Sequence, residues 1–134
     1  MRMISIAATS LTSLIFIASA TSLNAAGLCH FYAHAESHPE KHAYFTDVIS
    51  YRFSGDTCSG VGPEVYNIRD KWAEHLSKYT SSKEYIPQVV MQCDNSCKAP
   101  KQIEWVVTNL EKFLSHYNGR YEVEKITDFK IGNR

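Results

Sequence analysis

Apolar and polar side chains alternate near the start of this chain of 134 residues. Between residues 29 and 35, the apolar side chains occupy every second position: Cys29, Phe31, Ala33 and Ala35. A period of two residues is typical of a β-strand that buries one of its faces. The polar segment 36–42 contains Pro39 and predicts a turn after this strand.

Residues 43–53 predict a second strand, because their aromatic and β-branched side chains suit a pleated sheet. Four apolar side chains are predicted to share one of its faces: Phe45, Ile49, Tyr51 and Phe53. Asp47 interrupts that face, and burial there would make it a candidate general acid. The two strands are expected to form a hairpin, whose longer turn leaves the register open.

Two later segments have the apolar period of amphipathic helices. The first is predicted to begin at Pro63, because the first helical position does not need the missing N–H. Its apolar stripe consists of Val65, Ile68, Trp72, Leu76 and Tyr79. The second is predicted to begin at Pro100 and to stop at Gly119, which suits the left-handed conformation after a helix. Its stripe is the strongest periodic signal in the chain: Ile103, Val106, Val107, Leu110, Phe113, Leu114 and Tyr117.

Two further strands are predicted around the second helix. Residues 86–93 have a nearly continuous apolar centre, typical of a strand covered on both faces. Proline cannot donate a hydrogen bond to the ladder, so Pro87 is expected at the beginning of that strand or at a sheet edge. Residues 121–131 predict a last strand, in which the apolar phase changes between Val123 and Ile126. That change predicts either a bulge or a strand that leaves the sheet.

These elements predict a single α+β domain with the order β-β-α-β-α-β. Each helix has one apolar stripe and therefore covers one face of a sheet. We expect both helices on one face, which gives a two-layer sandwich with a mixed sheet and right-handed β-α-β crossovers. We expect disulfide bonds to staple this domain.

Residues 1–26 have the pattern of a secretory signal peptide: a short n-region with one positive charge, then an uncharged apolar run. Small residues favour cleavage after Ala26, with Ala20 and Ala25 as alternatives. The run is shorter than the roughly 20 apolar residues of a spanning helix. We therefore expect residues 27–134 to form a periplasmic or secreted protein without a membrane span.

The charges are balanced, with 14 Lys and Arg against 14 Asp and Glu, and the two signs are interspersed. A neutral chain does not attract phosphate backbones by bulk electrostatics, so we expect no nucleic-acid partner. No linear motif for a nucleophilic serine, a zinc hydrolase or a phosphate loop is present. We also expect no cofactor.

All four cysteines follow the leader, and an even number in an exported protein predicts two disulfides. Pairing Cys29 with Cys93, and Cys58 with Cys97, closes two long loops and is favoured, at about 3–4 kcal/mol each. The other two connectivities remain open. Three residues separate Cys93 from Cys97, whereas a thioredoxin-like motif has two, so a redox-active pair is not favoured.

The histidines are the most suggestive set of polar residues, because His30, His34, His38 and His42 recur at intervals of four. Imidazole is a common metal ligand, and the hairpin tip from His34 to His42 could gather several rings. A solvated polar turn explains the same spacing and is favoured over a metal site, and a pH-responsive surface is a third explanation. A small hydrolase that uses histidines and Asp47 is the enzymatic alternative.

Three tyrosines are not required by the predicted helix stripes: Tyr32, Tyr44 and Tyr66. Exposed tyrosines often anchor protein interfaces, although ordinary packing at the rim of a core also explains them. We therefore expect a small exported, disulfide-bonded protein that binds another protein in the cell envelope or outside the cell. An inhibitor, an immunity protein or an envelope accessory protein fits this description better than an enzyme.

Overall fold

The computed structural model describes residues 27–55, 57–58, 61–94 and 101–132. Its elements are β1 (Leu28–Ser37), β2 (His42–Phe45), β3 (Ile49–Arg52), α2 (Gly62–Leu76), β4 (Ile86–Cys93), α3 (Ile103–Tyr117) and β5 (Glu122–Lys125). The predicted leader lies outside the described residues. Within the described ranges, no helix has the length and apolar character needed to cross a membrane.

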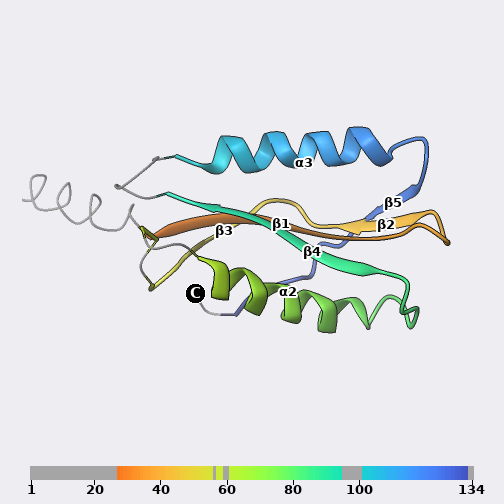
Figure 1. Ribbon diagram of the computed structural model, residues 1–134, viewed down its shortest axis with the longest axis horizontal. Coiled ribbons are helices and arrows are strands. Elements are labelled where there is room, and N and C mark those ends of the chain that lie inside the picture. Colours follow the sequence, from red (N-terminus) through yellow and green to blue (C-terminus); the bar gives the residue numbers. More distant parts are fainter. Residues whose placement is uncertain (1–26, 56, 59–60, 95–100, 133–134) are drawn as a thin grey trace, which may run out of the picture.

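The long strand β1 lies at the centre of a mixed sheet (Figure 1). β2 and β3 pair antiparallel with successive halves of β1 along one side. β4 pairs antiparallel with β1 along the other side, and β5 pairs parallel with β2. β4 therefore forms one edge of the sheet, and β5 and β3 form the opposite edge.

A β-bulge separates β2 from β3. Phe31 pairs with Ile49, and His34 pairs with Phe45. The segment from Phe31 to His34 therefore lies opposite a segment that is one residue longer, from Phe45 to Ile49. The connection between β2 and β3 thus contains one extra residue. This insertion divides the single strand that we expected over residues 43–53 into two strands.

Thr46 bridges the interrupted ladder. Its N–H donates to the carbonyl oxygen of Ala33 at 2.9 Å, and its Oγ1 accepts the N–H of Ala33 at 3.0 Å. Because one inserted residue reverses the facing of a strand, Phe45 packs on the α3 side whereas Ile49 packs on the α2 side. The prediction that these two side chains share a face is wrong.

Each helix covers its own face of the sheet (Figure 1). α2 packs on the α2-side core through Ile68, Trp72 and Leu76. α3 packs on the other core through Val106, Leu110 and Phe113. The α+β class, the mixed sheet and the two helices are confirmed, but the sandwich has three layers where we expected two.

The order of the strands explains the third layer. The connection from β3 through α2 to β4 passes across β1 in one direction, and the connection from β4 through α3 to β5 returns in the other. Each connection joins parallel strands, and such crossovers are right-handed. Two right-handed crossovers that run in opposite directions place their helices on opposite faces.

The last strand leaves the sheet early. β5 occupies four of the residues predicted over 121–131. Val123 packs on the α3 side, whereas Ile126, Phe129 and Ile131 pack on the α2 side. Of the two alternatives for this change of phase, the structure shows the departing strand.

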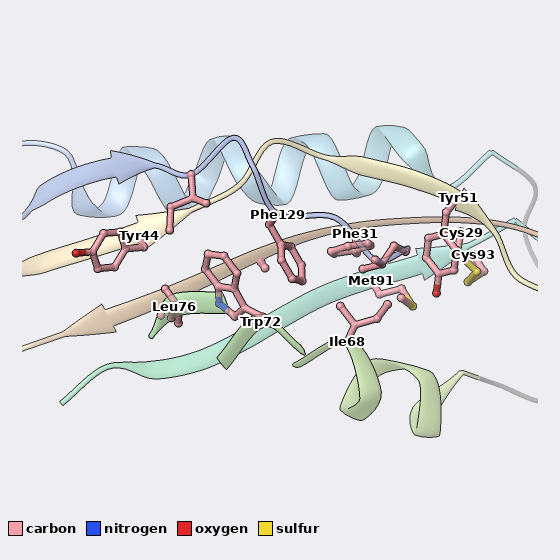
Figure 2. Close-up of a cluster of buried hydrophobic side chains, with 14 residues drawn as sticks. Cys29, Phe31, Tyr44, Tyr51, Ile68, Trp72, Leu76, Met91, Cys93 and Phe129 are labelled. Atoms are coloured by element: carbon pink, nitrogen blue, oxygen red, sulfur yellow. A yellow bond between two sulfur atoms is a disulfide. The ribbon is translucent and has the colours of Figure 1, made fainter. Parts of the chain in front are cut away.

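Cys29 and Cys93 lie opposite each other on β1 and β4 and form a disulfide. Figure 2 shows this bond at one end of the core that surrounds Phe31 and Trp72. Cys58 is also disulfide-bonded. Cys97 lies outside the described residues, so its predicted bond to Cys58 stays a prediction.

Candidate functional site

The three tyrosines considered as binding anchors do not form one surface. Tyr32 and Tyr44 are buried, whereas Tyr66 on α2 is 58% exposed. The guanidinium of Arg69 lies 4.8 Å from the centre of the Tyr66 ring. Tyr32 is covered because α3 lies on the face of β1 that a two-layer fold would have left open. Burial removes Tyr32 and Tyr44 from the surface that a partner can reach.

Asp47 lies on the bulge and is exposed to solvent rather than buried. Its carboxylate lies 3.0 Å from the Nζ of Lys125, and both side chains are accessible to water. A solvated ion pair of this kind contributes little to stability. The hypothesis that Asp47 is a buried general acid is therefore wrong.

The histidines of the hairpin tip have separate partners. His34 Nδ1 lies 2.9 Å from Glu36 Oε2, His38 bonds the hydroxyl of Tyr121, and His42 lies beside an acid of β5. Among the described residues, no three His, Cys, Asp or Glu side chains are placed to hold one metal ion. The tip therefore does not gather its imidazoles around a common point.

A polar network lies under the end of α3 nearest this tip. Glu36 is partly buried and accepts hydrogen bonds from His34 and Tyr117. Burial alone would raise the pKa of Glu36, but these bonds and the charge of His34 outweigh it and hold the pKa below its ordinary value. Burial, with a smaller contribution from Glu36, raises the pKa of Tyr32 to about 12. Burial and the hydrogen bond to Glu36 raise the pKa of Tyr117 to about 12.

We expect the free energy of unfolding to fall as the pH rises above about 10. Unfolded tyrosines lose their protons at about pH 10, whereas Tyr32 and Tyr117 in the fold keep theirs until about pH 12. A raised pKa in the folded state contributes stability below the unfolded pKa, and this contribution is lost as the pH rises through the folded pKa. Denaturant unfolding at a series of alkaline pH values measures the slope.

The variant Tyr117→Phe should flatten this alkaline slope, because it removes one proton that the fold retains. Tyr66→Phe is the matched control, since Tyr66 is exposed and far from Glu36 in the chain. If Tyr117→Phe and the wild type have the same alkaline slope, the raised pKa of Tyr117 is contradicted.

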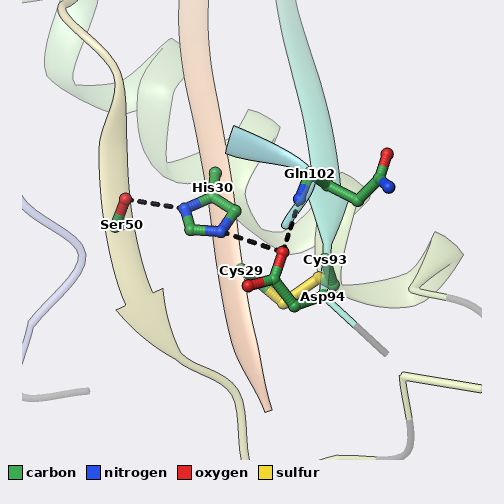
Figure 3. Close-up of polar contacts among 6 residues, drawn as sticks. All are labelled: Cys29, His30, Ser50, Cys93, Asp94 and Gln102. Atoms are coloured by element: carbon green, nitrogen blue, oxygen red, sulfur yellow. Dashed lines mark hydrogen bonds and ion pairs between the residues drawn. A yellow bond between two sulfur atoms is a disulfide. The ribbon is translucent and has the colours of Figure 1, made fainter. Parts of the chain in front are cut away.

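His30 is the centre of a second polar network, next to the disulfide (Figure 3). Its ring is buried, and its Nδ1 lies 2.8 Å from the Oγ of Ser50. Its Nε2 lies 3.3 Å from the Oδ1 of Asp94. The same Asp94 oxygen accepts the N–H of Gln102 at 2.6 Å, just before α3 begins.

The sheet and the disulfide position this network. Ser50 lies directly opposite His30 in the pairing of β3 with β1. His30 follows Cys29, and Asp94 follows Cys93, so the disulfide holds the imidazole and the carboxylate close together. Sequence reasoning noted His30 only as a member of the histidine series. Ser50 and Asp94 were missed because the contact depends on register.

The network has the order of groups that activates a serine hydroxyl. An ionised carboxylate only accepts hydrogen bonds, so the Nε2–H of His30 donates to Asp94 and Nδ1 is left as an acceptor for the hydroxyl of Ser50. A nucleophile, a base and a group that orients the base are the parts of such a relay. Ser50 is exposed, whereas only 3% of the His30 side chain is accessible. A ligand would therefore reach the hydroxyl of Ser50 first, with the imidazole behind it.

β4 presents a different kind of surface. It is the longest edge strand and contains no charged side chain from Ile86 to Cys93. The N–H of Asp94 donates to the carbonyl oxygen of Leu28 at 2.8 Å. Because hydrogen-bonded pairs alternate in an antiparallel ladder, the residues of β4 that bond β1 are Gln92, Val90, Gln88 and Ile86. The residues between them direct their backbone groups away from β1: Pro87, Val89, Met91 and Cys93. No described residue pairs with this outer edge.

A hollow of about 440 Å³ lies between the end of α2 and the beginning of β4. Its floor includes Leu76 and Pro87, and hydroxyl groups of the segment that follows α2 surround it. Among the described residues, Lys83 is the one charged residue of the lining, and the carboxylate of Glu40 accepts hydrogen bonds from Ser82 and Tyr85 of the same lining. A concave surface of this size falls within the range of ligand sites.

Comparison with family models finds no match, and searches of curated proteins and of solved structures find no significant similarity.

Proposed function

We propose that this protein acts by binding another protein in the cell envelope or outside the cell. An inhibitor, an immunity protein or an envelope accessory protein would each act in this way. The unpaired outer edge of β4 carries this proposal. A free edge is a template for pairing with another chain, and proteins usually protect it with charges, short length or a covering element.

β4 has little of this protection. It is eight residues long and uncharged, and Pro87 removes only the first of its outward N–H donors. Ile86 is 58% exposed at the beginning of the strand. The predicted leader and the disulfide-bonded cysteines support an oxidising compartment. An export signal, a stapled fold and an open edge together fit a binding domain.

Affinity purification of the tagged protein from an envelope extract tests the proposal. We expect a stoichiometric partner with the wild-type protein and none with Ile86→Lys/Gln88→Lys, because two charges protect the edge. Both side chains are exposed, so the variant should fold. Thr108→Lys/Ser115→Lys is the matched control, since it adds the same charge at exposed positions of α3. Recovery of no stoichiometric partner across several growth conditions would count against the proposal.

A small hydrolase is the second candidate, and the hydrogen-bonded series of Ser50, His30 and Asp94 favours it. In an acyl transfer, Ser50 Oγ would attack the acyl carbon and pass its proton to His30 Nδ1. The leaving oxygen would take that proton and depart as an alcohol. Water would then hydrolyse the acyl-serine by the same relay.

A fluorophosphonate probe tests this candidate. Mass spectrometry should find the adduct on Ser50 in the wild-type protein and no adduct in Ser50→Ala. Ser115→Ala is the control, because Ser115 is equally an exposed serine but does not belong to the network of His30 and Asp94. An unlabelled protein, or labelling spread over several exposed serines, would exclude an activated Ser50.

A further inference from the structure

We infer that a second copy of this chain covers the outer edge of β4 in the absence of a partner, so that the free protein is a reversible dimer with one continuous sheet. The inference rests on the proposed protein-binding function, because it describes how the same edge is regulated. Dimers with two-fold symmetry are the commonest oligomers, and each copy contributes the same surface to their interface. Antiparallel pairing of β4 with its own copy is an interface of this kind.

The backbone groups of β4 complement one another in this arrangement. Pro87, Val89, Met91 and Cys93 direct their backbone groups away from β1. A two-fold axis at Val90 places Val89 opposite Met91 of the second copy, and Pro87 opposite Cys93. This register pairs every outward residue with another outward residue, whereas a shift in either direction leaves some of them unpaired. The N–H that Pro87 lacks is missing only at the two ends of the ladder.

The opposite edge of the sheet limits the assembly to two copies. It consists of β5 and β3, which have four residues each. β5 contains Glu122, Glu124 and Lys125, and β3 ends at Arg52. Short length and charged side chains protect an edge against pairing. Association through β4 therefore closes at a dimer and does not continue into a fibre.

The charges of the chain favour a copy of the same strand as the occupant. A charged strand that pairs with its own copy brings like charges together, whereas β4 contains no charged side chain from Ile86 to Cys93. The whole chain has 14 Lys and Arg against 14 Asp and Glu, and removal of the predicted leader takes away Arg2 alone. Two exported copies therefore approach each other almost without net repulsion.

Two largely exposed apolar side chains lie beside this edge. Ile86 is at the beginning of β4 itself. Tyr66 precedes Ala73 by seven residues, which is two turns, so both lie on the same side of α2. Ala73 and Pro87 line the same hollow, so this side of α2 faces the edge of β4. Tyrosines are common anchors of protein interfaces, and a second copy would cover this one.

The area of the contact predicts a weak dimer. Eight residues of strand extend over about 26 Å. One helix covers each face of the sheet (Figure 1), at a distance of about 10 Å. The side of the molecule at β4 therefore gives about 1,000 Å² for two copies, which is near the lower limit of specific interfaces. A dimer of this size dissociates on dilution and leaves the edge to a partner that binds more tightly.

Sedimentation of the pure exported protein over a dilution series tests the inference. We expect a reversible monomer–dimer equilibrium for the wild type. Val89→Pro removes an outward donor without removing a bond to β1, so its dimer should be at least about tenfold weaker. Val89→Ala is the control, since it loses side-chain packing but keeps the N–H. A wild type that stays monomeric at every concentration, or a dimer that Val89→Pro does not weaken, would overturn the inference.

Cysteine cross-linking measures the register while every backbone donor is kept. Val90 lies opposite Val90 of the second copy as a non-hydrogen-bonded pair, whose Cα atoms are about 4.5 Å apart. Val90→Cys should therefore give a disulfide-linked dimer in non-reducing electrophoresis after exposure to air. Gln88→Cys is the matched control, because position 88 lies opposite position 92 of the second copy. Equal cross-linking of the two variants, or no cross-linking of Val90→Cys, would overturn the inference.

Failure of this inference differs from failure of the proposed function. A monomeric protein that still captures a stoichiometric partner would overturn the dimer and leave protein binding in place. A dimer that captures no partner would overturn the proposed function and leave the pairing of β4 with its copy. A partner that dissociates the dimer supports both. A partner that binds the intact dimer would overturn the inference that both use the same edge.

Discussion

Replacing both Cys29 and Cys93 with alanine is expected to lower the free energy of unfolding by about 4 kcal/mol. The two cysteines are separated by 64 positions in the sequence, so the bond closes a long loop and restricts the unfolded chain strongly. Both side chains are buried, and alanine fits such positions without leaving a reactive thiol. Denaturant unfolding of the variant and the wild type, at equal pH and salt, measures the difference.

Reduction of the wild-type protein provides the comparison for this variant. A reductant also breaks the bond of Cys58, so reduced wild-type protein should be no more stable than the oxidised double variant. An oxidised double variant within about 1 kcal/mol of the wild type would contradict the loop-closure argument.

Local periodicity was sufficient to predict where most elements form. The alternation over residues 29–35 predicted β1, and the stripes around Trp72 and Leu110 predicted α2 and α3. Gly119 adopts the positive φ expected after a helix, at 84°. These features depend on residues within a few positions of one another, so a single sequence is enough to infer them.

The layering could not be predicted from periodicity, because it depends on strand order. A helix stripe indicates that one face is buried but does not indicate which face of the sheet it covers. The bulge at Thr46 could not be predicted either. One inserted residue turns every later side chain of the strand to the opposite face of the sheet. The acid at Asp47 interrupts the apolar alternation at this insertion, but we interpreted Asp47 as a candidate general acid.

The two candidate sites depended on register more than on residue type. Ser50, His30 and Asp94 belong to three segments and contain no linear motif, so only the pairing of β3 and β4 with β1 brings them together. The free edge of β4 follows in the same way from the order of the strands. Its apolar centre predicted a strand covered on both faces, and β4 does pack on both cores, through Met91 on the α2 side and Val90 on the α3 side. The structure shows that an uncharged strand can also be an edge.

Replacing Trp72 with alanine is expected to lower the free energy of unfolding by about 4 kcal/mol, towards the upper end of large-to-small changes in a core. Trp72 is fully buried, and its ring centre lies 5.2 Å from that of Phe129. Phe129 belongs to the segment that follows β5, so Trp72 joins α2 to the last described part of the chain (Figure 2). The loss should therefore loosen that segment as well as α2.

Trp105→Ala is the matched control, because Trp105 on α3 is 48% exposed and should change stability by about 0.5 kcal/mol or less. Trp72→Phe separates the two contributions of the buried ring. The Nε1–H of Trp72 donates to the carbonyl oxygen of His34 at 2.9 Å, and phenylalanine removes that hydrogen bond. Trp72→Phe should therefore fall between the wild type and Trp72→Ala. Equal losses for Trp72→Ala and Trp105→Ala, measured by denaturant unfolding, would show that α2 does not pack as described.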